Sequence, residues 1–194
     1  MAPIESTDSP GDLADRFGRV YEEEVWSVYG FIAYRVRSRE EAEDLTQLTF
    51  ERALKAFGRF DPRRATVKTW LLAIARNLVI DHFRKAGAVH VGDLGEFLED
   101  GARHPDALVA PAVGESLGLE PELEAALGEL SQRDREVVAL RFGAEMTGQE
   151  IAHLTDLSLA NVQQILSRSL RRMRERLGDG AGPDRLSDAR NQRL

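Results

Sequence analysis

The chain has 194 residues and a formal net charge of −7 at pH 7, with 42% hydrophobic and 30% charged residues, a mixture typical of globular proteins. It contains no cysteine, which excludes disulfides, thiolate metal sites and a thiol nucleophile. The N-terminus lacks the basic start and apolar core of a secretory signal, and no apolar run approaches the ~18 residues of a membrane helix. We therefore expect a soluble, cytoplasmic protein.

Charge is unevenly distributed along the chain. Residues 12–87 hold 14 Lys and Arg against 12 Asp and Glu, whereas residues 88–121 hold one Arg against seven acids. Residues 162–177 hold five Arg and one Glu. Because salt screens charges beyond about 8–10 Å, a locally basic end can bind phosphate in a chain that is acidic as a whole. The net charge therefore does not exclude a nucleic-acid partner.

Residues 12–87, which we call the first lobe, show helical periodicity of apolar residues. Ser38 and Glu41 form a capping-box pattern, and Thr66 is a candidate cap for a long apolar helix. Gly and Pro punctuate the turn-rich segment before that cap. Three helices are expected, over residues 12–37, 38–57 and 66–87.

Residues 88–121 break every periodicity, because Gly, Pro and acidic residues are frequent there. The segment is longer than connections inside compact domains usually are, which favours a linker between two separate lobes. Solubility alone explains its acidic residues. We expect residues 1–11 and 178–194 to be disordered ends.

Residues 122–177, the second lobe, carry closely spaced helix-start signals. The capping residues are Ser131 with Asp134, Thr147 with Glu150, and Ser158. Two helices joined by a three-residue turn predict a helix-turn-helix, with Asp156 in the turn because Asp tolerates the left-handed conformation. No segment is a strong strand candidate. The predicted fold class is all-α, with two small helical domains.

The helix that begins after Ser158 has an apolar stripe and a polar face. The stripe consists of Leu159, Val162, Leu166, Leu170, Met173 and Leu177, and the opposite face of Ala160, Asn161, Gln164, Arg168, Arg171 and Arg172. Asn and Gln can pair with adenine, and Arg with guanine or phosphate. The helix dipole also favours Arg in the last turns whatever these residues contact. The helix alone is therefore equally compatible with DNA binding and with a polar face that only meets solvent. The preceding capped helix and turn favour DNA.

Ile165 lies at the border of this stripe. Edge-of-core packing is the favoured interpretation, and contact with a thymine methyl group or a protein partner is the alternative.

In residues 57–85, basic and aromatic side chains alternate, a pattern that holds unpaired bases in other proteins. Aromatic residues at helical spacing are usually core, and Trp70, Leu71 and Ile74 are expected there. The loop from Arg59 to Thr66 is the better candidate for contact, because loops are exposed.

An enzyme is disfavoured. Glu150 and His153 have the spacing of half a di-iron site, but a second such pair is missing, and the other histidines are scattered. We expect no catalytic residues, no metal and no cofactor.

In combination, "EEAEDLTQLTFERAL", "FDPRRATVKTWLLAIARNLVIDHFRK" and "LSQRDREVVALRF…TGQEIAHLTDLSLANVQQILSRSLRRMRERL" resemble the extracytoplasmic-function (ECF, group 4) sigma factors of bacteria. The resemblance implies that residues 12–87 are sigma region 2, which binds core RNA polymerase and recognises and melts the −10 element. Residues 122–177 would be region 4, which recognises the −35 element. The acidic linker would follow the RNA path of the polymerase.

The resemblance also implies individual site residues. Contacts to core polymerase are expected from Glu43, Asp44, Leu45, Gln47 and Phe50. Contacts to −10 DNA are expected from Arg59, Phe60, Asp61, Arg63, Arg64, Lys68, Arg76, Asn77, Asp81 and Arg84. Contacts to −35 DNA are expected from Ser158, Ala160, Asn161, Gln163, Gln164, Arg168, Arg171 and Arg172.

The expected partners are the β′ clamp and β flap of core RNA polymerase, promoter DNA and an anti-sigma factor. The sequence departs from the family pattern at two places, one in the polymerase contact and one in the −35 contact. Leu48 replaces an acidic residue of the polymerase-binding segment, and Gln163, Gln164 and Ile165 stand where the family has Lys, Ser and Arg. Fewer cationic contacts release fewer counterions, so we expect a weaker and less salt-dependent grip on the −35 element. A stand-alone helix-turn-helix regulator of duplex DNA is the alternative function.

Overall fold

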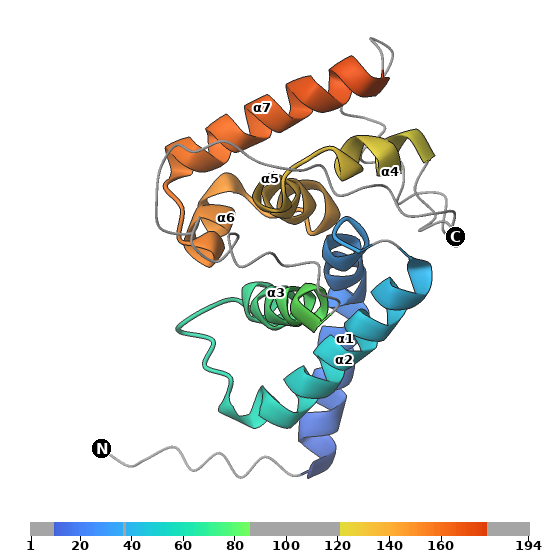
Figure 1. The fold of residues 1–194 in the computed structure, drawn as a ribbon. Helices are drawn as coiled ribbons and strands as arrows, with labels where there is room; N and C mark the ends of the chain where they lie inside the picture. Colours follow the sequence, from blue (N-terminus) through green and yellow to red (C-terminus); the bar gives the residue numbers. More distant parts are fainter. Residues whose placement is uncertain (1–9, 37, 86–120, 178–194) are drawn as a thin grey trace.

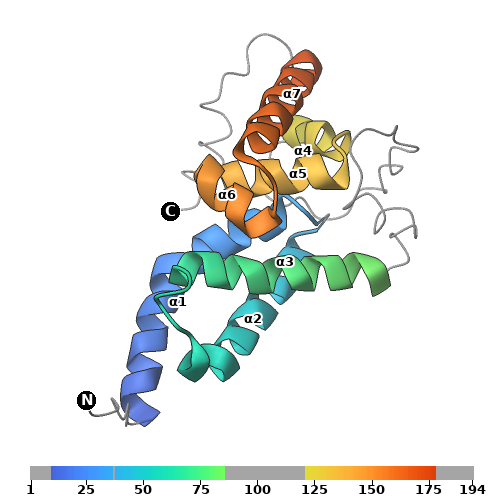
Figure 2. The same cartoon turned by 90° about the vertical axis from the view of Figure 1, so that its left-hand side faces the viewer.

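The computed structural model describes residues 10–36, 38–85 and 121–177 (Figures 1 and 2). All regular elements within these ranges are helices, so the predicted all-α fold class is confirmed. The expectations for residues 1–9, 86–120 and 178–194 lie outside the described part. The elements are α1 (Pro10–Ala33), α2 (Arg39–Ala56), η1 (Phe57–Arg59), α3 (Val67–Lys85), α4 (Pro121–Gly128), α5 (Gln132–Val138), η3 (Ala139–Gly143), α6 (Gly148–Thr155) and α7 (Leu159–Leu177).

The two predicted capping boxes fix the starts of α2 and α6. The backbone N–H of Glu41 donates to the Ser38 hydroxyl at 3.1 Å, and that of Ser38 donates to the Glu41 carboxylate at 3.2 Å. Thr147 and Glu150 repeat the arrangement at 3.3 Å and 2.8 Å. Each box satisfies amide groups that a helix start leaves without intrahelical partners. Both capping predictions are confirmed.

The first lobe consists of α1, α2 and α3, packed pairwise around an aromatic and aliphatic core (Figure 1). Phe17 meets Phe50 and Phe57 edge to face, at centroid distances of 6.3 Å and 5.2 Å. Leu71 and Leu72 of α3 are fully buried. The first helix ends at Ala33, earlier than the expected residue 37. The chain turns there while Arg35 and Val36 donate backbone hydrogen bonds to the Ile32 carbonyl, at 2.8 Å and 3.0 Å.

The second lobe places α4, α5 and α6 against α7 (Figure 1). Helix α4 was not predicted as an element. The helix that Ser131 was expected to cap begins as α5 but continues as the π-helical segment η3. Its wider backbone turn is seen where the N–H of Ala144 donates to the Ala139 carbonyl at 3.0 Å.

The helices form the two groups that the sequence predicted, and buried residues of both groups belong to one hydrophobic cluster. Helix α1 packs against η3. Helix α3 contacts α6, which lies next to it in Figure 2. We call this arrangement the closed arrangement. Within the described part of the chain, no helix combines the length and apolar character needed to cross a membrane.

Candidate nucleic-acid interface

A helix-turn-helix forms where the sequence predicted it, from α6 and α7. Asp156 adopts the left-handed conformation, with φ 57° and ψ 36°, and so turns the chain between the helices. The backbone N–H of Leu157 closes the turn onto the Ala152 carbonyl at 3.0 Å. Ile151 of α6 and Val162 of α7 are fully buried. This packing fixes the start of α7 relative to α6.

The solvent-facing side of α7 presents all eight residues that the resemblance assigned to −35 DNA. They are Ser158, Ala160, Asn161, Gln163, Gln164, Arg168, Arg171 and Arg172, and every one is exposed. Ile165 is only 7% exposed and belongs to the core cluster, so the predicted packing function is confirmed for it. The helix therefore carries an uncharged end followed by an arginine end.

Arg168 is held in place by the second lobe itself. Its guanidinium donates to the Asp134 carboxylate of α5 at 2.7 Å. The Asp134 side chain is 6% exposed, whereas that of Arg168 is 48% exposed. A buried carboxylate thus orients a guanidinium whose side chain is about half exposed, which leaves it accessible to a phosphate.

The segment between η1 and α3 combines a ring cluster with exposed cations. The Phe60 ring stacks nearly parallel to Phe57 (6.2 Å, 5°) and lies 5.0 Å from the Trp70 ring. Phe57 is buried, whereas Phe60 and Trp70 are half-buried. Arg59, Arg63 and Arg64 are exposed beside these rings in the chain. Leu71 is core and Trp70 packs against it, as predicted.

Local hydrogen bonds hold the loop of this segment. The Arg63 side chain donates to the Asp61 carboxylate (Nε–Oδ1 3.1 Å), and its backbone N–H donates to the same oxygen at 3.0 Å. These hydrogen bonds lower the pKa of Asp61. Thr66 accepts from the Thr69 N–H at 3.2 Å and so caps α3, as expected. The loop therefore has a defined shape although its cations face solvent.

The remaining residues expected to bind −10 DNA lie in different surroundings along α3. Asn77 is exposed, and Arg84 donates to Asp81 at 2.8 Å on the surface. Lys68 is half-buried. Arg76 faces the second lobe, where its Nε donates to Glu136 at 2.7 Å. The closed arrangement therefore brings Arg76 together with α5 and not with the loop cations.

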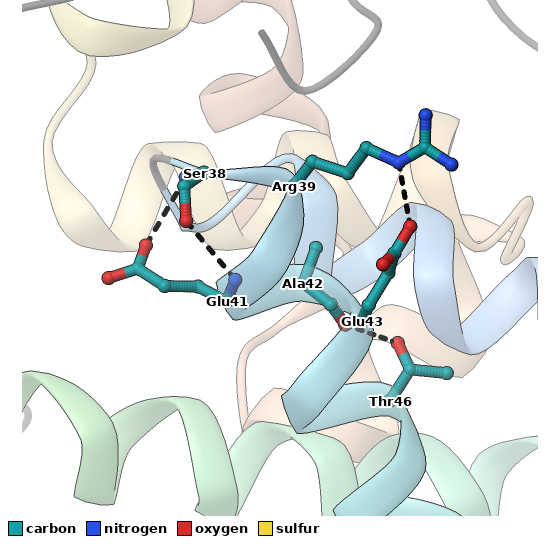
Figure 3. A network of polar contacts seen from close by, with 6 residues as sticks. All are labelled: Ser38, Arg39, Glu41, Ala42, Glu43 and Thr46. Carbon is teal, nitrogen blue, oxygen red and sulfur yellow. Dashed lines mark hydrogen bonds and ion pairs between the residues drawn. The ribbon is translucent and has the colours of Figure 1, made fainter. Parts of the chain in front are cut away.

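Helix α2 presents an acidic face beside its capping box. Figure 3 shows Glu43 paired with Arg39 at 2.6 Å, while the Thr46 hydroxyl donates to the Ala42 carbonyl at 2.7 Å. Among the residues expected to bind polymerase, Glu43, Asp44 and Gln47 are exposed. Leu45 and Phe50 are buried in the core, so they support this face from beneath. Leu48 is exposed on the same helix.

Sequence reasoning missed the residues that join the lobes. Arg35, at 4% exposed, donates to the Gln132 carbonyl at 2.6 Å, and Gly30 lies directly against Gly143. No local pattern marks them, because their partners lie about a hundred residues away in the chain. The described residues contain no group of three or more His, Asp or Glu side chains placed to hold a metal ion.

Comparisons with known proteins identify both lobes. The family described as Sigma-70 region 2 matches residues 20–89, and Sigma-70, region 4 matches residues 126–175. The chain is 34% identical to the ECF RNA polymerase sigma factor BldN of Streptomyces coelicolor over 168 residues, covering 87% of this chain and 62% of BldN. It is 30% identical to the ECF RNA polymerase sigma factor SigX of Bacillus subtilis over 169 residues, covering 85% of each chain.

The fold is similar to that of the sigma factor RpoE from Bartonella quintana, solved in complex with the anti-sigma factor NepR. The TM-score is 0.63 at 23% identity, covering 84% of this chain and 97% of that one. This likeness concerns the fold alone. The two matched regions and the relatives lead to one conclusion: the chain belongs to the ECF sigma factors of the sigma-70 family.

Proposed function

We propose that this chain divides promoter recognition between its lobes, with residues 12–87 serving the −10 element and core polymerase and residues 122–177 serving the −35 element. As an ECF sigma factor it directs RNA polymerase to initiate transcription at specific promoters and has no catalytic chemistry of its own. One observation carries the residue-level proposal. The exposed side of α7 holds the polar and cationic residues, and its buried side holds the packing residues.

In this proposal the start of α7 reads bases and its later turns grip phosphate. Asn161 and Gln164 are exposed amides, and each can donate to and accept from one adenine. Arg171 and Arg172 are exposed about two to three turns later, where cations can contact the DNA backbone. The buried Ile165 offers neither a charge nor a surface there. Fewer cations then contact DNA at positions 163–165 than in family members that have Lys and Arg there.

For the −10 element, the loop from Arg59 to Lys68 supplies cations beside the half-buried Phe60 and Trp70 rings. Capturing a flipped base costs a few kcal/mol of lost stacking, which contact with an aromatic ring offsets. The ring cluster and the hydrogen-bonded loop support this assignment because they supply a preformed shape.

For core polymerase, the exposed residues Glu43, Asp44 and Gln47 of α2 are the proposed contacts with the β′ clamp. Leu45 and Phe50 act indirectly, since they are buried and hold the helix in position. A contact of the second lobe with the β flap completes the polymerase interface in this proposal. An anti-sigma factor is a further proposed partner, by analogy with the complex of RpoE with NepR.

Run-off transcription tests the proposal, using core RNA polymerase and a promoter library with and without the full chain. Promoter-specific transcripts are expected only with the chain present. Arg171→Ala is expected to weaken binding to all selected promoters and to reduce the slope of log K against log salt by about 1. Arg174→Ala, an exposed arginine outside the assigned set, is the matched control. A chain that binds duplex DNA tightly but never associates with core polymerase contradicts the proposal.

A further inference from the structure

Arg168 is the first cation along α7 after the amides that are proposed to read bases. Residues 159–167 contain no charged side chain. Asn161, Gln164 and Arg168 follow one another at intervals of three and four residues, so they lie on one side of the helix. Because an α-helix rises about 1.5 Å per residue, Arg168 lies about 6 Å beyond Gln164 along the helix axis. A phosphate bound by Arg168 therefore fixes the position of the two amides along the DNA.

Asp134 of α5 determines where this guanidinium lies. Its carboxylate accepts a hydrogen bond from the Arg168 guanidinium at 2.7 Å. The Asp134 side chain is buried, and its backbone N–H donates to the Ser131 hydroxyl at 3.0 Å. The neighbouring Arg135 is also buried, and its side chain donates to the Leu127 carbonyl of α4 at 2.8 Å. The carboxylate therefore belongs to a part of the second lobe that is anchored independently of α7.

The other arginines of α7 have no buried anchor of this kind. Arg171, Arg172 and Arg174 are exposed and form no ion pair within the described part of the chain. Arg176 pairs with Glu129 at 2.8 Å, but these two side chains are 55% and 48% exposed. An exposed arginine loses rotamer freedom when it binds a phosphate, whereas a side chain that is already held in place loses less. Arg168 is therefore the cation of α7 that is ordered before DNA binds.

A purely structural tie between α5 and α7 is the alternative explanation of this ion pair. The two helices already contact each other, and both contribute buried apolar residues to the hydrophobic cluster, among them Val138, Val162 and Ile165. Burying a carboxylate costs desolvation free energy, and apolar residues of similar volume often stabilise a protein at least as well. An ion pair that leaves its cation 48% exposed is therefore better suited to holding a charge at the surface than to joining two helices.

We propose that Asp134 is a positioning residue for −35 recognition, which holds Arg168 against a DNA phosphate in a fixed register with the two amides. This inference rests on the division of promoter recognition proposed above. A guanidinium has several N–H donors, so Arg168 can donate to Asp134 and to a phosphate at the same time. Removing the carboxylate keeps the cation but frees its side chain. Selectivity for the −35 sequence then falls, while the general attraction to DNA does not.

The test compares holoenzymes assembled from core RNA polymerase and variants of the full chain. Each is bound to two promoter fragments that differ only in the −35 element, one selected and one scrambled, and the ratio of the two affinities measures −35 specificity. Asp134→Asn is expected to lower this ratio at least about fivefold, within the range of couplings between contacting residues. The matched control is Glu129→Gln, which removes the exposed partner of Arg176 on the same helix. It should change the ratio less than about twofold.

A double-mutant cycle shows whether Asp134 acts through Arg168. In the Arg168→Ala background, Asp134→Asn should change the ratio less than about twofold. Discrimination at the −10 element should stay unchanged in every variant, because it is assigned to the first lobe, whereas a general loss of folding would lower it too. If circular dichroism shows that Asp134→Asn does not fold, Arg168→Lys tests the same geometry. Lysine keeps the charge but lacks the planar fork of donors, so the ratio should again fall at least about fivefold.

Four results overturn the inference: an unchanged ratio in Asp134→Asn or Arg168→Lys, an equal fall in Glu129→Gln, a parallel loss of −10 discrimination, or a fall in Asp134→Asn that persists in the Arg168→Ala background. If Asp134 only reduced the local positive charge, Asp134→Asn would raise the affinity for both fragments and leave their ratio unchanged. The proposed function fails separately, when the wild-type chain yields no promoter-specific transcripts with core polymerase.

Discussion

The ion pair between Arg76 and Glu136 offers a quantitative test of how strongly the lobes are joined. Removing one partner of a buried pair typically costs about 3–5 kcal/mol. Because the Arg76 side chain is 19% exposed and can turn towards water, we expect the lower end, about 3 kcal/mol, for Glu136→Gln. With a urea m-value of about 2 kcal/mol/M, the unfolding midpoint should fall by about 1.5 M.

The matched control is the ion pair between Arg176 and Glu129, which has a similar 2.8 Å distance but side chains 55% and 48% exposed. Glu129→Gln should cost at most about 1 kcal/mol. Urea unfolding is followed by circular dichroism, which reports both lobes, and by tryptophan fluorescence. Both tryptophans, Trp26 and Trp70, lie in the first lobe. Coincident transitions in wild type would show that the lobes unfold together.

A double-mutant cycle with Arg76→Gln isolates the pairwise free energy. We expect a coupling of at least about 1 kcal/mol between Arg76 and Glu136. A coupling below about 0.5 kcal/mol, or equal losses for Glu136→Gln and Glu129→Gln, would refute the reasoning. The pair would then behave as a surface ion pair despite its burial.

Asp44→Arg should weaken the affinity for core polymerase at least tenfold without changing the unfolding midpoint. The control Glu23→Arg, on the exposed side of α1, should leave the affinity and the midpoint unchanged. Equal affinities of the two variants in a pull-down with core polymerase would contradict the assignment of α2 as the polymerase contact. Ile165→Ala should lower the free energy of unfolding by about 2–4 kcal/mol, as for other buried aliphatic residues, and denaturation measures this loss. Gln164→Ala should leave stability unchanged and alter the −35 base preference, which promoter selection measures. Hydrogen bonds from Thr147 hold the pKa of Glu150 below its ordinary value of 4.5, so the stability they contribute is present at neutral pH and is lost as pH falls through the lowered pKa. Acid unfolding should therefore show a smaller loss between about pH 5 and 3 in Glu150→Gln than in wild type; identical losses would contradict this.

Local signals explain which parts of the fold could be predicted. The capping boxes at Ser38 and Thr147 depend on residues three apart, and the left-handed turn at Asp156 depends on one residue, so a single sequence contains the necessary information. The apolar stripe of α7 is equally local, and Ile165 fell on its buried side. The same logic missed η3, whose wider turn lies against the distant helix α1 and has no local sequence pattern that marks it.

The arrangement of the lobes could not be predicted in this way. Gly30 and Gly143 each look like ordinary glycines until they meet across the interface. The resemblance grouped Arg76 with DNA contacts, while the structure pairs it with Glu136. Leu45 and Phe50 were likewise grouped with surface contacts because the polymerase-binding motif mixes exposed and buried positions. A sequence motif identifies the positions that a binding surface needs. It does not show whether a side chain contacts the partner or is buried and supports the residues that do.

The close contact between Gly30 and Gly143 also limits how freely the halves of such proteins can be exchanged. Sigma regions 2 and 4 invite treatment as interchangeable modules, because each folds around its own helices. Here, however, a region 4 from another protein that carries any side chain at the position of Gly143 would clash with the Gly30 backbone of this region 2. A chimera of that kind keeps both DNA-reading surfaces but loses the packing of the two lobes at this contact.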